Sequence, residues 1–94
     1  MQIIAQNKAV MSSREIAEVT GKRHDNVMKT IRSLVNKGVV SANETPYIHP
    51  QNGQIYLEFL LDYRNVMAAT SGYRAGLRAA ILHRVKTINV GTDK

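Results

Sequence analysis

The chain contains no cysteine and no tryptophan, and it has only one phenylalanine. Without thiolates, neither a disulfide nor a cysteine metal site can form, so packing alone must hold the fold. No apolar run approaches the roughly 18 residues that a membrane-spanning helix needs. The first residues also lack the charged-then-apolar layout of a secretion signal. We therefore expect a soluble intracellular protein with no membrane partner.

Acidic residues are scarce as well. Seven Asp and Glu stand against 13 Lys and Arg, which gives a formal net charge of +6. The segments Lys22–Lys37 and Asp62–Lys86 each hold five basic residues and one acidic residue, whereas Val39–Leu61 holds only Glu44 and Glu58 as charged residues. Positive charge on two predicted helical segments favours a polyanionic partner, although a solvated cationic face without a partner would have the same composition.

Residues with catalytic chemistry form no recognisable pattern. The three histidines, His24, His49 and His83, lie in separate segments, and no pair has the H-E-x-x-H spacing of a helical metal site. Neither a nucleophile elbow, a phosphate-binding glycine loop nor a close acid pair is present. We expect a protein that is not an enzyme, with no catalytic residue, no metal and no cofactor.

A helix start, a glycine turn and a second, basic helix follow each other in the first third of the chain. Ser12 and Glu15 have the spacing of a capping box, so a helix should begin at Ser13. Gly21 supplies the positive φ at which that helix can end, and it follows Ala17, a small residue that lets a second helix approach closely. This spacing is that of a DNA-binding helix-turn-helix, but helix pairs that only pack together also use it.

The second helix is predicted from an apolar stripe. Val27, Ile31, Leu34 and Val35 recur at helical spacing, and Lys37-Gly38 ends the pattern. With this stripe turned inward, the opposite face carries amides, hydroxyls and cations, which can read base edges and bind phosphates. The predicted base-reading residues are Arg23, His24, Asn26, Lys29, Thr30 and Ser33. The predicted phosphate-binding residues are Lys22, Arg32, Lys37, Arg74 and Arg78.

Beyond the second helix the pattern becomes that of a β-hairpin. Thr45–Ile48 is predicted to be an extended strand, because the residue before a proline avoids the helical conformation. Gln51–Gln54, with Asn-Gly at its centre, is predicted to form a turn, and Ile55–Phe59 is predicted to form the returning strand. With Val10-Met11 as a short third strand, this order predicts an α+β winged helix-turn-helix. The wing would be Tyr47–Tyr56, and without Lys or Arg at its tip it would contact DNA only through neutral donors. The wing residues predicted to do so are His49, Gln51, Asn52 and Gln54.

Two helices are predicted to follow the hairpin. Asp62 can cap a helix from Tyr63 to about Thr70, with Val66 and Met67 facing inward, and Ser71-Gly72 ends it.

The last helix is predicted from Tyr73 to about Ile88. Its apolar stripe consists of Tyr73, Leu77, Ile81, Val85 and Ile88. Gly76 costs about 1 kcal/mol of helix propensity relative to Ala, which close contact with another backbone would explain. Leu82 lies off the stripe, either as an ordinary exposed leucine or as part of a dimer seam.

The length of the chain suits one domain, residues 1–94. We expect it to be ordered over about 10–88, with a lead-in around Lys8 and a tail from Asn89.

Two motifs carry a resemblance to a known family. SREIAEVTGKRHDNV at Ser13–Val27 and SGYRAGLRAAILHR at Ser71–Arg84 are similar to segments of the phage regulatory protein Rha family, and GKRHDN is the most specific part. The resemblance covers about Val10–Ile88. It implies a winged-helix transcription regulator of a temperate phage or mobile element, acting in the cytoplasm of the bacterial host. Two features depart from the family pattern. Val85 occupies a position where we expect an aromatic residue. Many relatives also carry a further C-terminal domain, which the 94 residues do not include.

The expected partner is double-stranded DNA. One recognition helix reads only a short half-site, so a homodimer on a two-fold-related site is also expected. The alternative is an antirepressor that uses the same scaffold to bind a repressor protein. A structured-RNA binder is less favoured because the sequence, with a single phenylalanine, reveals no aromatic platform on a sheet.

Overall fold

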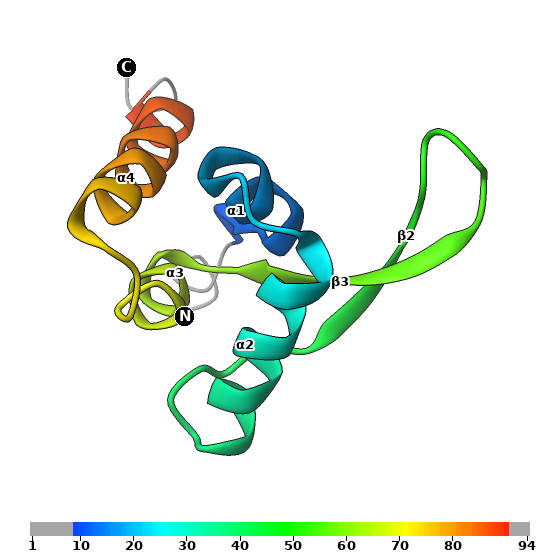
Figure 1. Cartoon of the computed structure of the whole chain (residues 1–94), viewed down its shortest axis with the longest axis horizontal. Coiled ribbons are helices and arrows are strands. Elements are labelled where there is room, and N and C mark those ends of the chain that lie inside the picture. The colour runs from blue at the N-terminus through cyan, green and yellow to red at the C-terminus, as the bar shows by residue number, and fades with distance from the viewer. Residues whose placement is uncertain (1–8, 91–94) are drawn as a thin grey trace, which may run out of the picture.

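The computed structural model describes residues 9–90, and only the backbone for 86–90. Within that range, four helices and a three-stranded antiparallel sheet of order β1-β3-β2 form the predicted α+β fold, which is compatible with a winged helix. The elements are β1 (Met11–Ser12), α1 (Ser13–Thr20), α2 (His24–Asn36), β2 (Glu44–Ile48), β3 (Ile55–Leu61), α3 (Tyr63–Ala69) and α4 (Ala75–Val90). Strands β2 and β3 with their connecting loop are here called the hairpin. The end of β3 lies among the helices, whereas the outer part of both strands and the loop project away from them (Figure 1).

The start and end of α1 follow from two local signals. The Ser12 hydroxyl accepts a hydrogen bond from the Glu15 N–H at 3.2 Å, and the Glu15 carboxylate accepts one from the Ser12 N–H at 2.9 Å. This is the predicted capping box, and α1 begins at Ser13 as predicted. Gly21 has φ 74°, and its N–H donates to the Ala17 carbonyl. A Cβ at Gly21 would meet nothing within 4 Å, so backbone conformation rather than space favours glycine there.

The core lies where α1, α2, β3 and the C-terminal helices meet. Val27 and Ile31 are buried as the apolar stripe predicts, and Leu34 and Val35 are partly buried. Met28 is buried too, although the predicted stripe did not include it. The largest fully buried apolar side chains are Phe59, Ile16, Ile31, Leu61 and Ile81.

The hairpin register is fixed along both strands. Glu44 lies opposite Phe59, and Ile48 lies opposite Ile55. Strand β2 begins one residue before the predicted Thr45, β3 continues past Phe59, and the short third strand is Met11–Ser12 rather than Val10-Met11.

The outer edge of β2 lacks one backbone donor. The His49 N–H donates to the Gln54 carbonyl at 2.8 Å, so these two residues form a hydrogen-bonded pair. Such pairs alternate with non-hydrogen-bonded pairs along an antiparallel ladder. Pro46, opposite Leu57, therefore occupies a position at which the N–H of any other residue would point outward. A proline there discourages a further strand from pairing with this edge.

The C-terminal helices differ from the predictions in detail. Asp62 caps α3 as predicted, since its side chain accepts from the Asn65 N–H at 2.8 Å. Val66 is fully buried, but Met67 is 41% exposed, so the inward orientation predicted for Met67 is wrong. The two residues are about 100° apart around the helix, and α3 buries only the side of Val66.

Helix α4 begins at Ala75, two residues after the predicted start, because the Tyr73 N–H donates to the Thr70 carbonyl within a turn. A Cβ on Gly76 would meet nothing within 4 Å, so the close backbone contact predicted there is absent. Leu82 is half-buried. The helix runs on to Val90, whereas the lead-in around Lys8, residues 91–94 and the side chain of Ile88 lie outside the described part.

Candidate nucleic-acid interface

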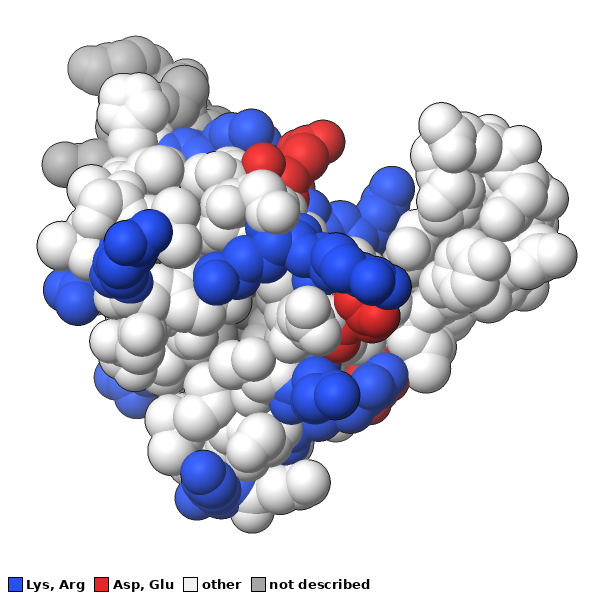
Figure 2. Space-filling view, viewed as in Figure 1, with Lys and Arg blue, Asp and Glu red and all other residues white. Residues whose placement is uncertain are grey.

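Charge divides the molecule into two parts. Figure 2 shows Lys and Arg side chains over the helical body and none on the projecting hairpin. In the sequence, the stretch Thr45–Leu57 contains no Asp, Glu, Lys or Arg. Electrostatic attraction for a polyanion therefore belongs to the helices and not to the hairpin.

The outward face of α2 holds four of the predicted base-reading residues. This face is opposite the buried side chains of Val27 and Ile31 on a helix of 13 residues. Its side chains are exposed and follow helical spacing; they are Asn26, Lys29, Thr30 and Ser33. An amide, an ammonium group and two hydroxyls on one open helix face can donate to and accept from base edges in a major groove.

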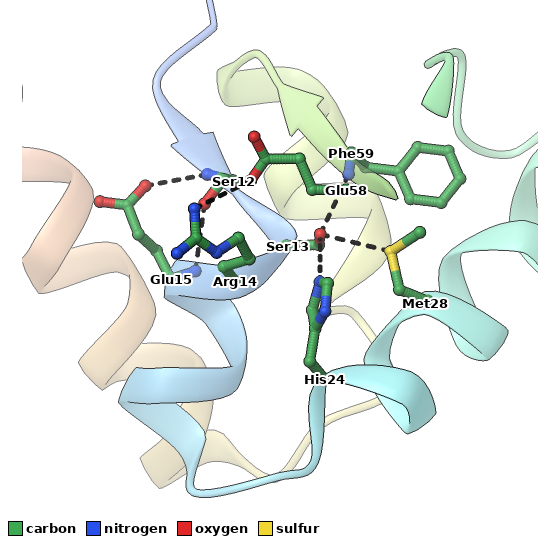
Figure 3. Close-up of polar contacts among 8 residues, drawn as sticks. All are labelled: Ser12, Ser13, Arg14, Glu15, His24, Met28, Glu58 and Phe59. Carbon is green, nitrogen blue, oxygen red and sulfur yellow. Dashed lines mark hydrogen bonds and ion pairs between the residues drawn. The ribbon is translucent and has the colours of Figure 1, made fainter. Parts of the chain in front are cut away.

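His24, by contrast, turns toward the protein (Figure 3). Its Nε2 lies 2.8 Å from the hydroxyl of Ser13, which is fully buried. The same Ser13 oxygen accepts from the Phe59 N–H at 3.0 Å and lies 3.4 Å from the Met28 sulfur. Ser13 thus joins α1, α2 and β3, and His24 anchors the first turn of α2 to that junction. Burial, followed by the nearby Arg14, lowers the pKa of His24.

Arg32 and Arg23 are held in ion pairs. The Arg32 guanidinium donates to both carboxylate oxygens of Glu44, at 2.9 and 3.0 Å, and so ties α2 to the base of the hairpin. These hydrogen bonds lower the pKa of Glu44. Arg23 lies 3.1 Å from Asp25, but their side chains are 79% and 66% exposed. A pair so open to water is weak and can exchange its carboxylate for a phosphate.

The remaining predicted phosphate ligands are exposed but dispersed. Lys22 lies in the turn before α2, with its ammonium group 5.1 Å from the centre of the Tyr73 ring. Lys37 caps the other end of α2. Arg74 directly precedes α4 and Arg78 lies in its first turn. Helix α4 packs on α1 and is far from the projecting part of the hairpin (Figure 1).

Hydrogen bonds within the hairpin engage three of the four side chains predicted to contact DNA there: those of His49, Asn52 and Gln54. Asn52 donates to the Tyr56 hydroxyl at 3.2 Å, and that hydroxyl donates to Gln54 at 3.1 Å. The His49 Nδ1 accepts from the Gln51 N–H at 3.2 Å.

Sequence reasoning gave no role to Arg14. Its guanidinium lies 4.0 Å above the Tyr47 ring and 3.9 Å from the Glu58 carboxylate. Both partners belong to the hairpin. The spacing of residues within α1 therefore could not predict that Arg14 contacts them. The Tyr47 and Tyr56 pair was also missed, because a two-residue Asn-Gly turn would place Tyr47 opposite Glu58. The loop instead spans residues 50–53, closed by His49 and Gln54, and this shifts the register so that Tyr47 lies opposite Tyr56.

In the part of the chain that the structure describes, none of the helices combines the length and apolar character needed to cross a bilayer. The same residues include no group of three potential metal ligands.

The chain matches the family described as phage regulatory protein Rha over residues 11–89. Searches of curated proteins and of solved structures give no significant match. Since the family match spans most of the 94 residues, the chain belongs to the phage regulatory protein Rha family, whose regulatory role in phages points to a non-enzymatic function.

Proposed function

We propose that this protein binds double-stranded DNA sequence-specifically and regulates transcription in the cytoplasm of a phage's bacterial host. The supporting observation is the outward face of α2, on which Asn26, Lys29 and Thr30 are exposed opposite the buried stripe. A B-DNA major groove admits one α-helix, in which an amide can pair with adenine and a lysine with guanine. Ser33 extends the same face toward the C-terminal end of α2.

Phosphate contacts would fix how this helix lies on the duplex. Lys22 and Arg23 before α2 and Lys37 after it are exposed at the two ends of the reading face. Arg74 and Arg78 would extend the basic footprint along the body.

His24 and Arg32 receive a revised role as positioning residues. Each holds α2 against another element, His24 through the Ser13 hydroxyl and Arg32 through the Glu44 carboxylate. We assign them to the support of the reading face, because contact with DNA would require these bonds to open.

The experiment begins with selection of bound fragments from a random DNA library. On the enriched site, Lys29→Ala should weaken binding by about five- to 100-fold, measured by fluorescence anisotropy. Lys22→Ala should weaken binding on all sequences and reduce the salt slope by about one. Arg64→Ala, which removes the same charge from an exposed position on α3, is the matched control and should change affinity least.

Two results would overturn the proposal: the absence of any enriched sequence, or wild-type binding by both lysine variants. If no DNA is enriched and the protein instead forms a stoichiometric complex with a purified phage or host repressor, the antirepressor function replaces it.

We also propose a homodimer on DNA, because one α2 covers only a half-site. The selected motif should then be two-fold related, and sedimentation of the complex should give two chains per site. A one-chain complex on an asymmetric motif would contradict the dimer and leave the DNA-binding proposal intact.

A further inference from the structure

The hairpin presents a row of aromatic rings. Tyr47 and Tyr56 are cross-strand partners with ring centres 6.2 Å apart. His49 stands edge-on to Tyr56 at 5.5 Å, and His24 stands edge-on to Tyr47 at 6.3 Å. These four residues, here called the ring row, connect the first turn of α2 with the hairpin loop.

Hydrogen bonds fix the outer end of the ring row before any ligand arrives. The Tyr56 hydroxyl is held between Asn52 and Gln54, and the His49 ring is held by the Gln51 N–H. Tyr56 is nevertheless 41% exposed. An exposed aromatic side chain that is already ordered loses little conformational entropy when a ligand binds, so the arrangement favours binding.

A groove runs alongside the ring row. It has a volume of about 550 Å³ and separates the hairpin from α2. Tyr47, His49 and Tyr56 line its hairpin side, and Asp25 and Arg32 are among the residues of its α2 side. A volume of this size lies within the range, about 300–1,000 Å³, of clefts that bind small molecules.

The charges around the ring row indicate which planar group fits. The hairpin from Thr45 to Leu57 is uncharged, but Arg14 lies over the Tyr47 ring at its inner end. Arg32, on the α2 side of the groove, is held by Glu44, and Asp25 adds a carboxylate to that side, so Arg14 is the guanidinium in contact with the rings. Rings for stacking beside this guanidinium match a nucleotide, which offers a planar base and a phosphate. In a duplex the base faces are hidden by stacking, so only an unpaired base can use such rings.

We propose that the ring row binds unpaired nucleotides, so that the protein prefers DNA in which a single strand adjoins a duplex. The inference rests on the proposed function, because α2 would hold the duplex portion while the hairpin receives the unpaired bases. It adds a second class of DNA contact, one based on stacking and only weakly dependent on salt.

The test compares three probes at one salt concentration by fluorescence anisotropy. They are a blunt duplex, the same duplex with an oligo-dT tail, and the same duplex with an abasic tail of equal length. The two tails carry the same phosphates, so any difference between them measures the contribution of the bases. We expect the dT tail to bind about five- to tenfold more tightly than the abasic tail.

Variants then assign this difference to the ring row. Tyr56→Leu should make the two tails equal while leaving blunt-duplex affinity unchanged, and Tyr56→Phe should retain the preference because it keeps the ring. Ile48→Thr is the matched control: it alters an exposed side chain of the same hairpin outside the groove, and it should retain the preference. Thermal unfolding of all three variants shows whether the hairpin change has disturbed the body.

The possible outcomes separate the two proposals. Equal binding of the two tails by the wild type, with blunt-duplex binding intact, would overturn the ring-row inference alone. Binding of the dT tail without binding of the blunt duplex would overturn the proposed duplex recognition and support the ring row. A proline-rich peptide that binds through Tyr56, together with equal binding of the tails, would overturn the inference by giving the row to a protein partner.

Discussion

The helical body and the hairpin offer a nucleic acid two different kinds of contact. The body carries Lys and Arg side chains on its helices, whereas Thr45–Leu57 of the hairpin carries no charge and gathers aromatic rings. Attraction by the body must weaken with salt because it acts on phosphates, whereas the stacking of a base on an uncharged ring neutralises no phosphate and releases no counterion. In the two proposals above, the helices of one small domain hold the duplex and its hairpin recognises unpaired bases.

The largest expected change in the free energy of unfolding comes from two substitutions on β3 that show where the core ends and the exposed part of the hairpin begins. Phe59 and Leu57 lie two apart on β3 and point to the same side of the sheet, yet Phe59 is 2% exposed and Leu57 is 44% exposed. Phe59→Ala should lower the free energy of unfolding by about 3–5 kcal/mol because it leaves a cavity in the core. Leu57→Ala should lower it by about 0.5 kcal/mol or less, as is usual at the surface. Urea denaturation measures both, and equal losses would show that the hairpin is stabilised as part of the core.

The next effect concerns the buried hydroxyl that joins the body to β3. Ser13→Ala leaves the Phe59 N–H without its acceptor and His24 without its anchor. We expect a loss of about 1–3 kcal/mol in the free energy of unfolding, since a buried unpaired donor costs its full desolvation. Ser33→Ala on the exposed face of α2 is the control and should change stability little. If the two variants were equally stable, Ser13 would have no role in holding the three elements together.

The body's architecture was largely predictable from local sequence signals, and its cross-element contacts were not. The capping box at Ser12, the positive φ of Gly21 and the Asp62 cap each depend on neighbours in the chain, and all three were predicted correctly. His24 was assigned to base reading because it adjoins Lys22 and Arg23 in sequence. Its ring instead reaches Ser13, and only the packing of α1 on α2 brings these two residues together.

The candidate site divides in the same way. Helical periodicity placed Asn26, Lys29 and Thr30 on one open face, whereas the engagement of Arg32 by Glu44 depends on how the hairpin leaves the body. The ring row was missed because its members come from α2, both strands and the loop between them. Single aromatic residues scattered along a sequence give no periodic signal.

A smaller effect follows from the lowered pKa of His24. Its value in the folded protein lies below the ordinary 6.5, so the unfolded chain takes up the proton first as the pH falls. The stability that depends on neutral His24 is therefore complete above about pH 6.5 and is lost as the pH decreases through that value toward the pKa of the folded state. Urea denaturation at several pH values should show this loss in the wild type. In His24→Gln the dependence should be flatter; identical pH profiles would contradict the anchoring role of His24.

The smallest change in stability is expected for the ion pair between Arg32 and Glu44, which ties α2 to the hairpin. The effect of breaking this pair is therefore measured through DNA binding. Glu44 is solvent-exposed, so Glu44→Gln should leave the unfolding midpoint nearly unchanged. The substitution also removes a negative charge at the base of the hairpin and replaces the two charged acceptors of the Arg32 guanidinium with one neutral amide oxygen. A freed Arg32 becomes available to a phosphate, so the slope of log affinity against log salt on random-sequence duplex should steepen by about 0.9. Affinity for the selected site should rise less than affinity for random duplex, because Arg32 no longer holds α2 in place. An unchanged slope would mean that Arg32 stays out of reach of DNA even when it is released.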